Sequence, residues 1–195
     1  VAIPQIGNTQ HLCLLKLLSD NGLKTVEEGG TVTVTAVENA DVQNMMDQGN
    51  IDAAKSHIEK SLKLAPNYSV AIDNLGTVYL AEGNSSKAES LFKKAIAINP
   101  NSASAYYHLA QLECNAGNYA KCLTYLNKCL AWQGYSSYAY NLRGDAFRLQ
   151  GNEAAAISAY KKAIEITPEN LAPYANLASI YEARKDYDLA LDAYK

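Results

Sequence analysis

Three cysteines and a histidine lie within one stretch of the chain and raise the question of a metal site. Cys114, Cys122, Cys129 and His108 offer the thiolate and imidazole ligands that zinc prefers. Their spacing lacks the short Cys-x-x-Cys hairpins that pre-arrange a tetrahedral zinc site. Cys122 and Cys129 also stand where alanines stand 34 residues earlier in the chain. The sequence therefore predicts that these cysteines pack in a core, with no metal and no other cofactor.

The same cysteines are poor candidates for a disulfide framework. Cys122 and Cys129 are seven positions apart. On a helix this spacing separates them by roughly 10 Å, which is too far for a disulfide. Neither Cys13 nor Cys114 has an evident partner. This cysteine usage favours a reducing compartment such as the cytoplasm.

The sequence contains none of the common catalytic motifs. The chain has no nucleophile elbow, no phosphate-binding Walker loop and no His-Glu-x-x-His. Gly29 and Gly30 form too short a glycine run to hold a phosphate, and Asp186, Asp188 and Asp192 are typical of a solvated helix face. The sequence therefore predicts no catalytic residues and a chain that is not itself an enzyme.

Composition excludes two further classes of partner. The 195 residues are 48% hydrophobic and 19% charged, which is typical of a folded chain. The net charge is only −3, and Lys and Arg are scattered, so no basic stripe could neutralise a row of phosphates. The apolar runs are far shorter than the ~20 residues that a membrane-spanning helix needs. We therefore expect neither nucleic acid nor a membrane span.

The elements that carry these residues recur at a fixed period. A glycine followed by asparagine appears every 34 residues, and prolines recur at intervals of 34 and twice 34. The glycines are Gly49, Gly83, Gly117 and Gly151, and the prolines are Pro66, Pro100 and Pro168. Such regular spacing indicates a structural repeat.

Each repeat has the pattern of a helical hairpin. Apolar spacing predicts one helix over 71–81 and a second over 87–98. Gly83 suits the end of the first helix, because glycine accepts a left-handed conformation. Pro100 ends the second helix, because proline cannot continue the hydrogen-bonded turns.

This pattern resembles the tetratricopeptide repeat (TPR) family. The unit that starts at Ser69 carries residues of the family signature, namely Leu75, Gly76, Tyr79, Ala88, Phe92, Ala95 and Pro100. The resemblance implies an all-α fold, an α-solenoid of TPR helical hairpins that forms a right-handed superhelix with a concave inner face. It predicts units at 35–68, 69–102, 103–136 and 137–170, and a partial unit at 171–195.

The two ends of the chain depart from the repeat. Residues 1–34 form a short non-repeat segment, a cap or the remnant of an upstream domain, with a helix expected over 11–18 and a strand over 31–35. The partial last unit exposes an apolar edge that includes Leu189, Leu191 and Tyr194. We expect continuation of the chain or self-association to cover it.

The resemblance also implies where a partner binds. In the TPR family, one stripe along the first helix of each unit usually faces the concave groove. Amides, hydroxyls and aromatic rings dominate this stripe, and amides can pair with the backbone of an extended peptide. The predicted partner-binding residues are Asn74, Thr77, Tyr107, His108, Gln111, Tyr138, Asn141, Asp145 and Asn176.

Two functions follow from this interpretation. The first is a protein-interaction scaffold or adaptor that binds a peptide segment or helix of a partner protein in the groove. The alternative is the substrate-docking arm of a larger enzyme whose catalytic domain lies outside these residues. Both make the partner a protein or peptide.

Overall fold

The structure, a computed structural model, describes residues 46, 49–132 and 136–193. The predicted N-terminal segment, its helix and its strand lie outside these residues, as does most of the first helix of the 35–68 unit. Every regular element in the described part of the chain is an α-helix. The chain divides into two compact units, Val1–Ile98 and Asn99–Lys195.

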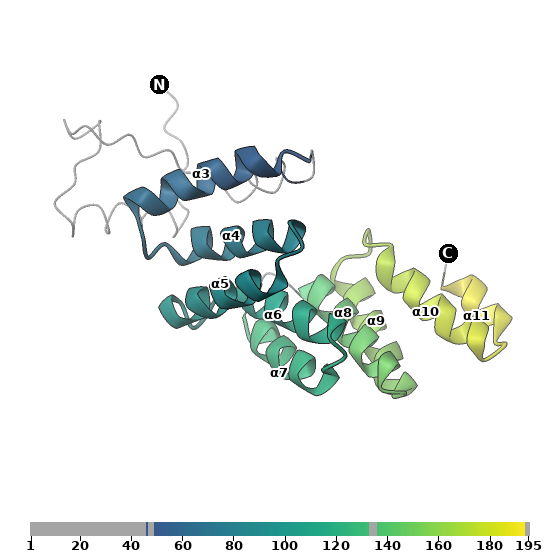
Figure 1. The fold of residues 1–195 in the computed structure, drawn as a ribbon. Helices are drawn as coiled ribbons and strands as arrows, with labels where there is room; N and C mark the ends of the chain where they lie inside the picture. The colour runs from purple at the N-terminus through teal and green to yellow at the C-terminus, as the bar shows by residue number, and fades with distance from the viewer. Residues whose placement is uncertain (1–45, 47–48, 133–135, 194–195) are drawn as a thin grey trace, which may run out of the picture. The chain divides into compact units, whose positions relative to one another are not determined.

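The first unit contains three described helices (Figure 1). They are α3 (Ile51–Leu64), α4 (Ser69–Ala81) and α5 (Ser85–Ile98). Helix α4 packs against both α3 and α5. Small and β-branched side chains form the α3–α4 core, where Ala54, Ile58 and Val78 are buried.

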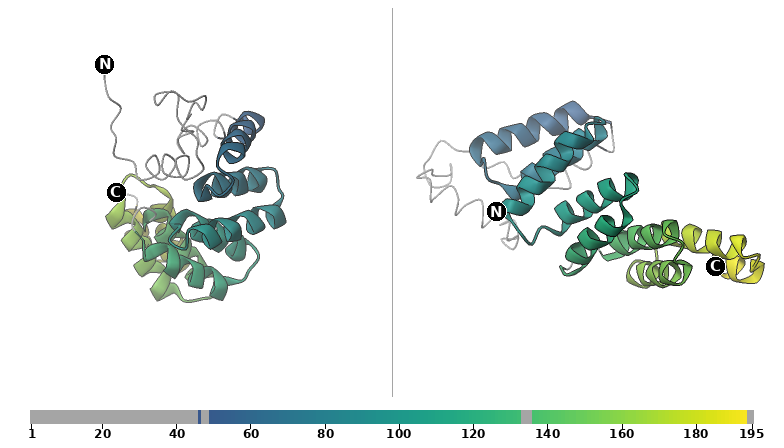
Figure 2. Two further views of the ribbon diagram at one scale, coloured as in Figure 1. Left: turned by 90° about the vertical axis from the view of Figure 1, so that its left-hand side faces the viewer. Right: turned by 60° about the horizontal axis from the view of Figure 1, so that its bottom comes forward.

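The second unit is a series of helices, each in contact with the next (Figures 1 and 2). Helix α8 also contacts α6 and α10, each two helices away along the chain. These three helices are the first helices of successive hairpins. The helices of the unit are α6 (Ala103–Asn115), α7 (Tyr119–Leu130), α8 (Ser136–Leu149), α9 (Glu153–Ile166), α10 (Ala172–Ala183) and α11 (Tyr187–Asp192).

The recurrent Gly-Asn pair forms the turn of each hairpin. Gly83 has φ +79°, in the left-handed region that favours glycine. The side chain of Asn84 then accepts a hydrogen bond of 3.1 Å from the Lys87 amide and so caps the first turn of α5. In the last hairpin, the glycine place is taken by Lys185, which has φ 64°.

Close helix packing explains the glycines inside the first helices. A Cβ on Gly76 would lie 2.5 Å from the ring of Phe92, and one on Gly144 would lie 2.4 Å from the ring of Tyr160. Both rings are completely buried. Each ring therefore fills the space that the missing side chain leaves in the facing helix.

The prediction of an all-α chain of helical hairpins is confirmed for the described residues. The predicted boundaries of the repeat units stay a prediction. Helix α11 exposes Tyr187, Leu189 and Leu191. Self-association through this helix likewise stays a prediction.

Candidate functional site

A hydrogen-bonded network joins α8, α9 and α10 in the second unit. The Asp145 carboxylate oxygen Oδ1 accepts hydrogen bonds from the Tyr160 hydroxyl at 2.7 Å and from Asn176 Nδ2 at 3.2 Å. Asn176 Nδ2 also donates to Asn141 Oδ1 at 3.0 Å. The network therefore holds two amides from consecutive first helices side by side.

The chemistry of Asp145 sets the orientation of both amides. An ionised carboxylate only accepts hydrogen bonds, so Asn176 must turn its nitrogen toward Asp145. Asn141 must then turn its oxygen toward that same nitrogen. The other two amide atoms, Asn141 Nδ2 and Asn176 Oδ1, make no hydrogen bond to a described residue. Both atoms are accessible to solvent. The pair thus presents one donor and one acceptor in fixed positions.

Burial governs the electrostatics of this network. Burial raises the pKa of the Asp145 carboxyl, although the hydrogen bond from Tyr160 and the charge of Arg148 act in the opposite direction. Burial also raises the pKa of the Tyr160 hydroxyl, and the hydrogen bond to Asp145 adds to that rise. Tyr160 therefore stays a donor throughout the physiological pH range.

Helix α6 adds an aromatic edge to the network. Burial raises the pKa of Tyr107 to about 12, and smaller contributions come from Cys129, Tyr138 and Asp145. Helix α6, which carries Tyr107, also contacts α8, which carries Tyr138 and Asp145. The Tyr138 ring is 63% exposed. The ring of His108 meets Tyr107 edge-on, with centroids 5.7 Å apart.

We call the resulting area the α6–α8–α10 surface. It comprises Tyr107, His108, Gln111, Tyr138, Asn141, Asp145 and Asn176. Hydrogen bonds bring together Asn141, Asp145 and Asn176. Tyr107 and Tyr138 lie on the contacting helices α6 and α8, and Gln111 is half-buried on α6.

The other two predicted residues belong to the first unit. Asn74 and Thr77 are half-buried on α4. The Thr77 hydroxyl donates a hydrogen bond of 3.3 Å to the backbone oxygen of Asp73, within the same helix. Both residues therefore belong to the first unit and not to the α6–α8–α10 surface.

Sequence reasoning missed the role of Tyr160. The predicted partner-binding residues did not include Tyr160, whose ring is buried. Its hydroxyl nevertheless reaches Asp145, one of the predicted partner-binding residues. A signal was present in the repeat: the residue 68 positions before Tyr160 is Phe92, and the residue 68 positions before Asp145 is Thr77. The carboxylate of Asp145 and the hydroxyl of Tyr160 thus both occur in the later unit, and neither occurs at the equivalent positions of the earlier one.

Three of the four cysteines lie within the described helices. Cys114, Cys122 and Cys129 are buried thiols, in keeping with core packing. Among the described residues there is no group of three or more potential metal ligands. The sequence suggested no partner for Cys114, but the structure places the Cys122 thiol next to it.

The helical hairpins match the sequence models of a known protein family. Four tetratricopeptide repeat models match consecutive parts of the chain, at residues 46–68, 69–112, 101–169 and 159–192. The chain belongs to the tetratricopeptide repeat family. The predicted membership of the TPR family is thus confirmed. No curated protein matches the chain significantly.

Solved structures share the TPR fold. MamA is similar with 26% identity and a TM-score of 0.64, over 81% of this chain and 91% of that chain. PilF from Pseudomonas aeruginosa has 18% identity and a TM-score of 0.72, over 78% of this chain and 70% of that chain. The Cut9–Hcn1 hetero-tetramer of the APC/C has 23% identity and a TM-score of 0.70, over 95% of this chain but 35% of that chain. The last two likenesses concern the fold alone.

TPR membership supports a protein-interaction scaffold. The fold is typically non-catalytic, and TPR proteins bind protein partners. Within the described residues, no helix has the length and apolar character needed to cross a membrane.

Proposed function

We propose that this TPR protein is a scaffold that binds an extended segment of a partner protein along the α6–α8–α10 surface. The Asn141–Asn176 pair carries the proposal, because it holds a donor and an acceptor in fixed positions. A peptide backbone has the complementary groups, a carbonyl that accepts and an amide that donates. The pair therefore suits main-chain recognition.

Preorganisation favours this use of the pair. The hydrogen bonds to Asp145 and between the two amides restrict both side chains before a ligand arrives. A ligand then loses less free energy to side-chain ordering, which otherwise costs about 0.5–1.5 kcal/mol per immobilised side chain. Fixed amides also distinguish this surface from a merely solvated helix face.

The aromatic residues supply contact area beside the amides. The exposed Tyr138 ring and the half-buried Tyr107 ring each combine an apolar face with a polar end. Such side chains contribute strongly to protein interfaces. We expect them to contact side chains of the bound segment, while the amides contact its backbone.

Asn74 and Thr77 form a separate part of the proposal. They occupy the same repeat positions on α4 as Asn176 and Asp145 occupy on α10 and α8. We expect them to contact a partner from the first unit. Their contribution is to be measured independently, with Asn74→Ala and Thr77→Ala.

The test begins with a peptide selected from a random library against the full chain. Its affinity is then compared for the parent, Asn141→Ala, Asn176→Ala and the control Asn127→Ala, an exposed asparagine on α7. Loss of a hydrogen bond of about 1 kcal/mol predicts an affinity reduced roughly fivefold for the first two variants. The control is expected to bind like the parent.

A backbone substitution in the peptide makes the test specific. Replacing the contacting amide N–H with an ester oxygen removes the donor that Asn176 is proposed to accept from. The ester should weaken binding to the parent but not to Asn176→Ala, because the contact is already absent there. If the ester weakened binding equally for the parent and for Asn176→Ala, the result would argue against main-chain recognition by Asn176.

A further inference from the structure

Two cysteines lie on opposite sides of one hairpin turn. Cys114 is in the last turn of α6 and Cys122 is in the first turn of α7. Cys114 is 7% exposed and Cys122 is completely buried. Both side chains are therefore enclosed where α6 and α7 pack against each other.

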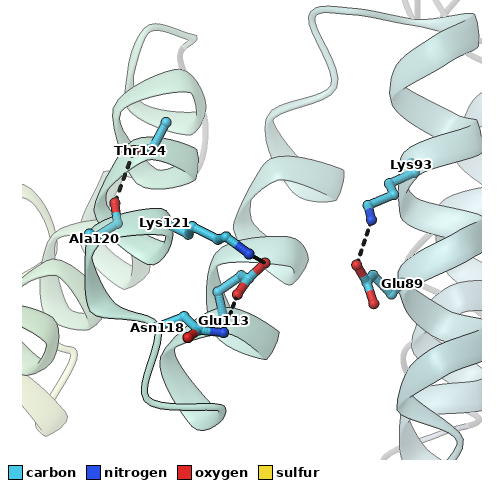
Figure 3. Close-up of polar contacts among 7 residues, drawn as sticks. All are labelled: Glu89, Lys93, Glu113, Asn118, Ala120, Lys121 and Thr124. Carbon is cyan, nitrogen blue, oxygen red and sulfur yellow. Dashed lines mark hydrogen bonds and ion pairs between the residues drawn. The ribbon is translucent and has the colours of Figure 1, made fainter.

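Polar contacts close to the cysteines join the end of α6 to the start of α7 (Figure 3). Lys121 Nζ lies 3.7 Å from Glu113 Oε1. The Asn118 side chain donates to Glu113 Oε2 at 2.8 Å, and the Asn118 amide donates to the Glu113 carbonyl at 2.8 Å. The end of α6 is thereby held against the start of α7.

In the flanking hairpins, Gly76 and Gly144 approach the rings 16 positions later. The equivalent residues of this hairpin are Ala110 and Leu126, and one helical turn closer to the hairpin turn the same register pairs Cys114 with Cys122.

This register brings the two buried thiols side by side across the hairpin, and the mutual influence of their sulfurs agrees with that placement. Burial raises the pKa of both thiols. The Cys122 thiol offsets part of this rise at Cys114, whereas Cys114 adds to the rise at Cys122. Cys114 is also the more exposed of the two. Cys114 is thus the thiol that an external reagent meets first.

We propose that Cys114 and Cys122 form an oxidation-sensitive dithiol site, which reacts with a hydroperoxide and becomes a disulfide that links α6 to α7. The site is independent of the proposed peptide-binding function. The third thiol of these helices, Cys129, is not part of the site. Cys129 is as buried as Cys122, and burial alone raises its pKa to about 11. Among the described residues, Cys129 therefore serves as an internal comparison.

The reaction balances with the hydroperoxide as its oxidant. The Cys114 sulfur, as thiolate, attacks the terminal peroxide oxygen, so an S–O bond forms, the O–O bond breaks and an alcohol or water leaves. The Cys122 sulfur then attacks the Cys114 sulfenic sulfur, so the S–S bond forms and hydroxide leaves with the Cys122 proton as water. The two thiols lose two electrons and the peroxide gains them.

Peptide mapping of the full chain tests the site. The reduced native protein is treated with hydrogen peroxide, blocked with N-ethylmaleimide, denatured and digested with trypsin. Cleavage after Lys121 and Lys128 places the three thiols on separate peptides, 95–121, 122–128 and 129–143. The expected product is peptide 95–121 linked to peptide 122–128, and it should be lost when a reductant is added.

Several results of the same map would overturn the proposal. One is recovery of the Cys114 and Cys122 peptides as separate, singly modified species after the free thiol of Cys114 has been consumed. Another is a Cys122 peptide linked mainly to 129–143, or to peptide 1–16, which holds Cys13. This readout needs only the parent protein, so it does not depend on whether a variant folds.

Matched variants then assign the chemistry. Cys129→Ala should retain the linked peptide, whereas Cys114→Ala should abolish it and leave Cys122 as free thiol at the same peroxide dose. Far-UV circular dichroism verifies that each variant keeps its helices. Oxidation of Cys122 at the parental rate in Cys114→Ala would show that Cys114 is not the receiving thiol.

Discussion

The Tyr160 hydroxyl donates a hydrogen bond of 2.7 Å to the carboxylate of Asp145. This bond connects the two helices of one hairpin and also reaches the Asn141–Asn176 pair through Asp145. In the first unit, Phe92 and Thr77 occupy the equivalent places. Both units thus have a buried ring at this position, and in the second unit the ring carries a hydroxyl that bonds to Asp145.

Removal of this hydroxyl should destabilise the protein. Tyr160→Phe keeps the buried ring but leaves Asp145 with one fewer donor in a partly dehydrated site. We expect the free energy of unfolding to fall by about 1–2 kcal/mol, measured by urea denaturation with far-UV circular dichroism. The control is Tyr187→Phe, whose ring is 66% exposed and which should leave the urea midpoint unchanged.

Asp145 should make stability depend on pH. Burial raises its pKa above the ordinary value of 3.8, so the folded chain holds the proton more tightly than the unfolded chain. Its contribution is therefore most favourable below pH 3.8 and is lost as the pH rises through the folded-state pKa.

The variant Asp145→Asn isolates this effect. The amide oxygen can still accept from Tyr160 and Asn176, but it carries no charge. We expect the stability of the variant relative to the parent to be greatest near neutral pH and to decline toward acidic pH. Urea midpoints of both proteins across the pH range measure it, and a constant difference would contradict the assignment.

The contact between Gly144 and Tyr160 should tolerate no added methyl group. A Cβ at position 144 would lie 2.4 Å from the Tyr160 ring, so Gly144→Ala is expected to cost about 1–3 kcal/mol of stability. The preceding hairpin has Ala110 and Leu126 in the equivalent places. Adding Gly144→Ala to a Tyr160→Leu background should therefore cost much less.

A double-mutant cycle of unfolding free energies measures this coupling. Equal costs of Gly144→Ala in both backgrounds would show that the ring is not what excludes the methyl group.

The last hairpin should be improved by restoring its glycine. Lys185 has φ 64°, a left-handed conformation that disfavours side chains with a Cβ. We expect Lys185→Gly to raise the free energy of unfolding by ~1 kcal/mol. The matched control is Lys161→Gly in the middle of α9, which should instead lower it by about 1 kcal/mol, because glycine is unfavourable inside a helix.

The hairpin pattern was predictable because its causes are local. A left-handed glycine after one helix and an asparagine cap before the next act within a few residues, and both recur every 34 residues. The predicted helix break at Gly83 is confirmed. Membership of the TPR family followed from the same residues.

Side-chain partnerships across helices required the tertiary structure. The pairs Tyr160–Asp145, Asn141–Asn176 and Cys114–Cys122 join residues 15, 35 and 8 positions apart. They depend on the register and close approach of packed helices, which a sequence period does not specify. The sequence by itself thus determined the repeat, its turns and the side chains on its first helices. Only the packed helices decided which of those side chains meet, because hydrogen bonds and thiol contacts form over a few ångströms.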